Sequence, residues 1–162
     1  MEQIIRHIAE QINSEIKSFR PVSGGDISSA FMLETQNKKL FLKVNSKSFA
    51  RSMFLAEQQG LQAIEDTKTI SVPRVYLVDE LGGKAFLLMD FIESRRPNAK
   101  DFMHLGRDLA KLHLVSNDQF GFSSDNFIGS LPQFNALHAD WAEFYRDERI
   151  MPQLELAKKN NA

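Results

Sequence analysis

The sequence of 162 residues contains no cysteine. That absence excludes disulfide scaffolds, cysteine-ligated zinc sites, thiol nucleophiles and cysteine redox switches. An excess of one charge is lacking too, because 20 Lys and Arg residues are balanced by 21 Asp and Glu residues, which leaves a net charge of -1. Proteins that hold nucleic acid or anionic membranes by general attraction carry a clear basic excess. We therefore expect neither nucleic acid nor a membrane as a partner.

Long hydrophobic runs are also missing. The densest apolar stretch, residues 85–89 (AFLLM), stops at Asp90, far short of the roughly 20 residues that span a bilayer. The first residues (MEQIIRH) are polar every few positions and contain no apolar segment of the secretory type. These features predict a soluble, cytoplasmic protein, whose 43% hydrophobic residues are enough to form a packed core.

Hydrophobic periodicity predicts the elements of the first half. Isoleucines at positions 4, 5, 8, 12 and 16 recur at helical spacing and predict a helix over residues 3–17. Strand-like residues at 30–35 and 40–44 flank a polar turn and predict a hairpin. A helix is predicted over 49–65, followed by a second hairpin, 75–78 with 85–89, around the Gly82-Gly83 turn.

The second half is predicted to be mainly helical. After Asn98, which suits an N-cap, the residues Phe102, Leu105, Leu109 and Leu112 recur at helical spacing. Residues 123–133 are predicted as a loop, and residues 138–158 as a helix interrupted near Pro152. Strands with one inserted helix, followed by helices only, indicate an α+β fold. The segment 95–98 (RRPN) favours a division into lobes of residues 1–92 and 93–162.

Two charged residues stand among apolar neighbours. Lys43 lies inside an apolar strand, and Glu57 lies on the apolar stripe of the following helix, 14 residues later. Each has an ordinary interpretation, since a strand lysine is usually on the outer face and a glutamate at the edge of a stripe reaches water. A carboxylate among apolar side chains is costly without a partner. The pattern therefore favours an ion pair between Lys43 and Glu57.

A glycine turn precedes the lysine strand. Residues 23–30 (SGGDISSA) combine two glycines with three hydroxyl side chains, which suits a loop whose N–H groups approach an anion, although an ordinary hairpin turn fits as well. The ordered set is more specific: glycine turn, strand lysine, helix glutamate, then a strand that ends in a linker. This order is typical of the nucleotide-binding half of a protein-kinase-like fold.

The sequence resembles the fructosamine kinases (ketosamine kinases), within the wider group of aminoglycoside- and choline-kinase-like enzymes. The matching segments cover nearly the whole chain: 22–27 (VSGGDI), 41–45 (FLKVN), 54–57 (FLAE), 72–75 (VPRV), 86–91 (FLLMDF), 105–113 (LGRDLAKLH), 120–122 (FGF), 125–130 (DNFIGS) and 140–157. The resemblance implies a protein-kinase-like α+β fold: a small antiparallel-sheet N-lobe with one inserted helix, followed by the start of a helical C-lobe.

The resemblance also implies a nucleotide site and substrates. ATP would be the phosphate donor with Mg²⁺ as cofactor, and a ketosamine-like small molecule would be the acceptor. Lys43 would contact the phosphates and Glu57 would hold the lysine. The remaining nucleotide-binding residues would come from the glycine turn and from the hinge, namely Gly24, Gly25, Asp26 and Ser28, with Met89, Asp90, Phe91 and Ile92.

One departure from the family pattern concerns catalysis. The sequence contains no His-Gly pair, so the family's His-Gly-Asp catalytic loop and the metal-binding residues that follow it are missing. We expect the catalytic base and the Mg²⁺ ligands to lie beyond Ala162, and the 162 residues alone to be inactive. Three hypotheses follow: the N-terminal half of a ketosamine kinase, an inactive half-length module that binds nucleotide or protein, or a related aminoglycoside- or choline-type kinase. Uncovered apolar side chains after residue 93 also predict self-association.

Overall fold

The computed structural model describes residues 1–23 and 27–160. The chain packs as two compact units, residues 1–112 and 113–162. The predicted lobe boundary at residues 92 and 93 refers to the lobes of a longer fold and stays a prediction. No helix in the described part of the chain is both long and apolar enough to cross a membrane.

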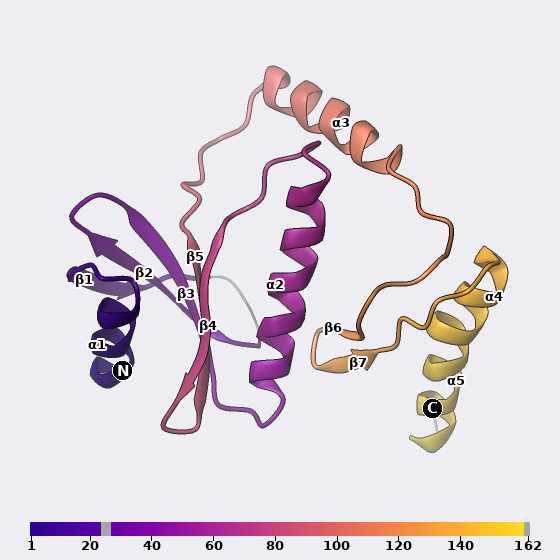
Figure 1. Ribbon diagram of the computed structural model, residues 1–162, viewed down its shortest axis with the longest axis horizontal. Helices are drawn as coiled ribbons and strands as arrows, with labels where there is room; N and C mark the ends of the chain where they lie inside the picture. Colours follow the sequence, from indigo (N-terminus) through magenta and orange to yellow (C-terminus); the bar gives the residue numbers. More distant parts are fainter. Residues whose placement is uncertain (24–26, 161–162) are drawn as a thin grey trace. The chain divides into compact units, whose positions relative to one another are not determined.

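The first unit is built on a five-stranded antiparallel sheet with the order β1-β2-β3-β5-β4 (Figure 1). Its strands are β1 (Ile16–Pro21), β2 (Ser29–Thr35), β3 (Lys39–Asn45), β4 (Val75–Leu81) and β5 (Lys84–Asp90). Both predicted hairpins are confirmed. In the β4–β5 turn, Gly82 and Gly83 adopt left-handed φ values of 60° and 72°, which glycine takes up at no steric cost.

Helices α1 (Glu2–Gln11) and α2 (Ala50–Asp66) cover opposite faces of this sheet (Figure 1). Side chains alternate along a strand, so β3 and β5 supply residues to both faces. On the α1 side, Ile4 and Ile8 pack against Leu40, Leu42, Phe86 and Leu88. On the α2 side, Phe54 packs against Ala85, Leu87 and Met89. Burial on both faces makes β5 the most apolar strand of the sheet.

The predicted helix over residues 3–17 is wrong in its second half. Helix α1 ends at Gln11, and Asn13 takes a left-handed φ of 48°, a conformation that asparagine tolerates and that ends a helix. Ile16 instead begins strand β1, which the periodicity did not predict. Both Ile12 and Ile16 pack against the α1-side core, so their apolar character reflects the same core reached through two different elements.

Helix α3 (Ala99–His113) follows the sheet and confirms the predicted helix after Asn98. The Asn98 Oδ1 atom accepts the Lys100 N–H at 2.9 Å, as expected of an N-cap. None of the residues of α3 is buried. Its apolar stripe is therefore uncovered, with Phe102 62%, Leu105 53% and Leu109 41% exposed.

The second unit holds a small hairpin and a C-terminal helical segment. Strands β6 (Asn126–Ile128) and β7 (Leu131–Gln133) pair within the segment predicted as a loop, which corrects that prediction. Helix α4 (Trp141–Tyr145) begins after Asp140, whose side chain caps it, so residues 138–140 are not helical as predicted. A π-helical turn, η1 (Arg146–Ile150), joins α4 to α5 (Met151–Lys159) just before Pro152, which explains the predicted interruption.

Candidate functional site

Lys43 on β3 and Glu57 on α2 form the predicted ion pair. Lys43 Nζ lies 2.5 Å from Glu57 Oε2, and the two side chains are 26% and 31% exposed. The ammonium group also lies 5.8 Å from the ring centre of Phe54, which is fully buried. The ordinary interpretations required each charge to point into water by itself. The two side chains bond to each other instead. The pair stands where strand β3 meets the helix that covers its α2-side face.

A pocket of about 590 Å³ lies between the start of the sheet and the segment after β5. All four residues predicted for the hinge line it. We call residues 89–92 the hinge segment. The full lining is Arg20, Pro21, Val22, Ser23, Phe41, Pro73, Met89, Asp90, Phe91, Ile92 and Ser94. More of this surface is apolar than polar, as is usual in sites that bind small molecules.

Strand alternation connects the pocket to the ion pair. Phe41 lines the pocket and precedes Lys43 by two residues on β3, so both side chains stand on the α2-side face. Lys43 pairs in register with Leu87 on β5, and Phe41 pairs with Met89. Lys43 itself does not line the pocket. It is placed beside it, one step further along the same face.

The backbone of the hinge segment is held by neighbouring strands. The Asp90 N–H donates to the Arg74 carbonyl at 3.0 Å, and the Phe91 N–H donates to the Lys39 carbonyl at 3.4 Å. The side chain of Lys39 bonds to Glu93, which raises the pKa of Lys39 and lowers the pKa of Glu93. Ile92 makes no hydrogen bond to residues 1–23 or 27–160 and is 68% exposed. Its N–H and C=O groups are therefore available to a ligand.

The predicted residues Gly24, Gly25 and Asp26 lie outside the described part of the chain. Ser28 lies within it, and its hydroxyl accepts a hydrogen bond from Asn45 Nδ2 at 3.1 Å. The same Nδ2 atom donates to the Ile27 carbonyl at 3.0 Å, and Asn45 is 7% exposed. Asn45 thus ties the end of the glycine turn to β3. Sequence reasoning missed this role, although a polar residue directly after Val44 was a signal for it.

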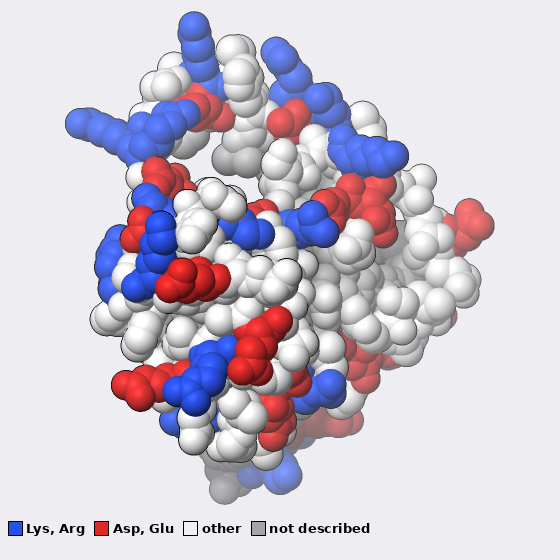
Figure 2. Space-filling model, turned by 60° about the vertical axis from the view of Figure 1, so that its left-hand side comes forward, with Lys and Arg blue, Asp and Glu red and all other residues white. Residues whose placement is uncertain are grey.

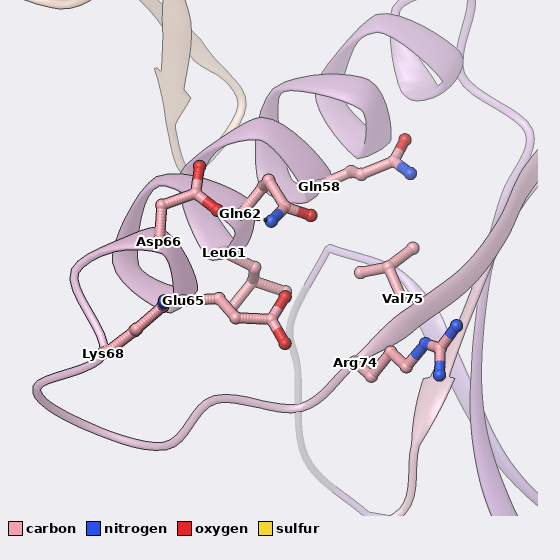
Figure 3. Close-up of a pocket in the computed structure, with 8 residues that line it drawn as sticks. All are labelled: Gln58, Leu61, Gln62, Glu65, Asp66, Lys68, Arg74 and Val75. Carbon is pink, nitrogen blue, oxygen red and sulfur yellow. Dashed lines mark hydrogen bonds between the residues drawn. The ribbon is translucent and has the colours of Figure 1, made fainter.

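A second hollow of the first unit has a different character. About 650 Å³ in volume, it lies between the C-terminal half of α2 and the start of β4 (Figure 3). Its lining mixes amide, acidic and basic side chains: Gln58, Leu61, Gln62, Glu65, Asp66, Lys68, Arg74 and Val75. Among the residues that the structure describes, none of those predicted for the nucleotide site lines this hollow.

The second unit contains a further hollow of about 690 Å³, which Asp125 helps to line. The Asp125 carboxylate accepts the N–H of the buried Asn135 at 2.9 Å. Asp125 therefore supports the fold of this unit.

Within residues 1–23 and 27–160, no three His, Asp or Glu side chains come together in a way that would hold a metal ion. On the face shown in Figure 2, basic and acidic side chains are interspersed.

Comparison with known proteins adds independent information. A family model described as fructosamine kinase matches residues 1–162. The chain is 36% identical over 159 residues to a probable ketoamine kinase of Synechocystis sp., covering 94% of this chain and 54% of that protein. It is 41% identical over 146 residues to a chloroplastic protein-ribulosamine 3-kinase of Oryza sativa subsp. japonica, covering 88% of this chain and 42% of that protein. The chain thus spans about half the length of the curated relatives it matches.

Solved structures show the same fold. The crystal structure named "Putative fructosamine-3-kinase" from Haemophilus somnus 129PT matches with a TM-score of 0.85 and 29% identity, covering 97% of this chain and 54% of that one. Spectinomycin phosphotransferase APH(9)-Ia, at 18% identity and a TM-score of 0.54, shares the fold over 72% of this chain and 38% of its own. These matches confirm the protein-kinase-like α+β fold. With the family model spanning all 162 residues, the chain belongs to the fructosamine kinase family.

Proposed function

We propose that this chain forms the ATP-binding part of a ketosamine kinase, which transfers a phosphoryl group from ATP to a sugar hydroxyl of a glycated amine. The observation that carries the proposal is the 2.5 Å pair of Lys43 with Glu57 beside a largely apolar pocket. Phosphoryl transfer depends mainly on positioning and on stabilising negative charge. A lysine whose position is fixed by a carboxylate serves both needs.

In this proposal the purine ring of ATP enters the 590 Å³ pocket. Val22 and Phe41 offer it apolar surfaces, and the free backbone groups of Ile92 offer it hydrogen bonds. Lys43 contacts the phosphates, while Glu57 keeps the ammonium group in place. The turn that contains Gly24, Gly25 and Asp26 would cover the phosphates, and Asn45 anchors the end of this turn through Ser28.

The catalytic base is assigned to residues that this sequence does not contain. It has no His-Gly pair, and the described residues offer no cluster of metal ligands. When bound, Mg²⁺ would neutralise charge on the phosphates. We assign its ligands, like the base, to residues beyond Ala162. A protein of these 162 residues alone is then expected to bind nucleotide without transferring phosphate.

A second candidate function follows from the same missing motif. A half-length protein without a base would be a nucleotide-binding or protein-interaction module in its own right. The reading frame after Ala162 distinguishes the two. Continuation into a His-Gly-Asp segment favours the kinase, and a stop codon favours the module. The choice among ketosamine, aminoglycoside and choline substrates requires a substrate panel with the longer protein.

Calorimetric titration of the chain with ATP, with and without Mg²⁺, tests the proposal. We expect saturable binding of one nucleotide per chain. The matched control is Gln62→Ala, because Gln62 lines the second hollow (Figure 3) and its side-chain amide donates to Asp66 on the same helix. Unchanged affinity in this variant would argue against binding in the second hollow, as the proposal requires. Weaker binding would place it in the second hollow, and no binding would contradict the proposal for this chain.

The proposal includes weak self-association through the stripe of α3. Phe102, Leu105 and Leu109 are each about half exposed. Burying a large apolar side chain completely is worth roughly 1.5–3 kcal/mol, so the three half-buried side chains supply roughly 2–5 kcal/mol per copy. Association itself costs about 4–15 kcal/mol. Dimers should therefore appear only at high protein concentration.

Light scattering after size-exclusion chromatography, over a range of concentrations, measures this association. Leu105→Lys should abolish it. His104→Lys adds the same charge off the stripe and should leave it unchanged. A chain that stays monomeric at every concentration, or equal effects of the two variants, would contradict the stripe as the contact surface.

A further inference from the structure

Both carboxylate oxygens of Asp90 accept hydrogen bonds at the base of the hinge segment. Asp90 Oδ1 accepts the Tyr76 hydroxyl at 2.7 Å, and Asp90 Oδ2 accepts the Arg74 N–H at 3.0 Å. The Asp90 N–H donates in return to the Arg74 carbonyl. Three hydrogen bonds thus join Asp90 to Tyr76 of β4 and to Arg74, the residue just before that strand. The Asp90 carboxylate is used within the protein, and Asp90 also belongs to the lining of the pocket.

An irregularity in β4 brings Tyr76 to this position. Val75 pairs with Met89 and Leu77 pairs with Leu88, so β4 has one residue more than β5 at this point. In a regular strand Tyr76 would share a face with Val78, which packs on the α2 side. Instead Tyr76 and Leu77 both pack against the α1-side core. Bulges of this kind redirect a side chain and are frequent beside active sites.

The ring of Tyr76 is itself held by two cations. The Lys38 ammonium lies 3.7 Å from the ring centre, and the Arg74 guanidinium lies 5.5 Å from it. Both distances are within the range of a cation–π contact. Lys38 belongs to the turn between β2 and β3, so the tyrosine connects that turn to β4 and to the end of β5. A phenol held in this way has little freedom to move its hydroxyl away from Asp90.

We infer that Tyr76 and Asp90 form a clasp that fixes the backbone of the hinge segment and thereby sets where a purine sits in the pocket. The inference rests on the proposed function, since it concerns the same pocket. The clasp acts from the sheet face opposite to Phe41 and Met89, so Tyr76 touches no nucleotide. Tyr76 is therefore a positioning residue. Its effect should appear in the recognition of the base and not in the recognition of the phosphates.

Tyr76→Phe is the variant of choice, because it removes the hydroxyl and keeps the ring, its packing and its cation contacts. Tyr145→Phe is the matched control, since Tyr145 is the only other tyrosine and lies in the second unit. Hydrogen exchange of the Asp90 and Phe91 amides, followed by NMR without ligand, reports directly on the hinge segment. We expect exchange roughly threefold to tenfold faster in Tyr76→Phe, the range for loss of one hydrogen bond, and no change in the control.

Calorimetry with adenosine, inosine and inorganic triphosphate gives the second readout. In Tyr76→Phe, adenosine affinity should fall by roughly threefold to tenfold. The ratio of adenosine affinity to inosine affinity should become smaller, and triphosphate affinity should stay the same. A purely structural role would lower the melting temperature and leave the adenosine-to-inosine ratio unchanged, which would overturn the inference. Unchanged amide exchange would overturn it too, whatever the chain binds. Failure of the unmodified chain to bind adenosine would instead overturn the proposed function, and the inference with it.

Discussion

Replacing Lys43 by methionine separates the role of its charge from its role in packing. Methionine has a similar length and suits the surroundings of Phe54 and the α2-side face. The ion pair with Glu57 is 26% and 31% exposed, so its contribution to stability should be close to that of exposed pairs, about 0.2–1 kcal/mol. Glu57 also reaches water when its partner is removed. The variant should therefore fold and unfold much like the original chain.

The expected effect on ATP binding is larger. A hydrogen bond to a charged group is worth roughly 1.5–3 kcal/mol, and 1.4 kcal/mol corresponds to tenfold in affinity. Lys43→Met should thus weaken ATP binding by roughly tenfold to a hundredfold. Adenosine has no phosphate, and its affinity should not change. Equal losses for ATP and adenosine would show that the substitution disturbs the pocket itself, contrary to the assigned role of Lys43.

Glu57→Gln completes a double-mutant cycle. It keeps the size of the side chain but removes the charge that holds the Lys43 ammonium, so ATP binding should weaken by less than in Lys43→Met. The double variant should bind ATP no more weakly than Lys43→Met alone, since Glu57 acts only through Lys43. Residues in direct contact show coupling of about 0.5–3 kcal/mol in such cycles. Losses that simply add would refute the claim that the two residues act as one unit.

Two further predictions concern stability and titration. Gly121→Ala should destabilise the second unit by about 1–3 kcal/mol, because φ is +140° at Gly121 and a Cβ there would meet a backbone oxygen at 2.7 Å. Thermal unfolding measures the effect, with Gly60→Ala in α2 as the control, since nothing lies within 4 Å of a Cβ at Gly60. Equal unfolding midpoints for the two variants would contradict the prediction. The Arg95 guanidinium holds the pKa of Asp101 at about 2, below its ordinary 3.8, so the stability from this carboxylate is present above pH 3.8 and is lost as the pH falls towards about 2. Arg95→Gln should raise the pKa of Asp101 in an NMR titration, and an unchanged titration would rule out Arg95 as the cause.

The elements that the sequence predicted well are those whose signals are local. The hairpin of β4 and β5 combines two apolar segments with a Gly-Gly turn, and α2 carries a regular stripe that includes Phe54. Strand β1 was missed because it lies at the edge of the sheet and is largely exposed. An edge strand faces solvent over much of its surface, so its sequence need not alternate. The helical spacing of isoleucines extends past Gln11, where α1 ends, because Ile16 of β1 packs into the same core as the isoleucines of α1.

The Lys43–Glu57 pair could be predicted for a different reason. Each residue alone is a charged group among apolar side chains, and such a group needs a partner. The strand and the helix that carry them are adjacent in sequence, so the choice of partner was narrow. The resemblance to fructosamine kinases then supplied a role for the pair, which its geometry alone does not provide.

The Tyr76–Asp90 clasp shows what a sequence pattern leaves out. From the sequence pattern alone, Tyr76 would be interpreted as a strand residue that packs in the core. Asp90, at the end of an apolar strand, would be interpreted as the start of a linker. Their hydrogen bond exists only because β4 gains one residue against β5 between Val75 and Leu77. A one-residue shift of this kind moves a side chain to the other face of the sheet, and it is decided by how both strands pack on their two helices. The residues that bear charge at the site are therefore readable in the sequence, whereas those that hold its backbone in place depend on strand register.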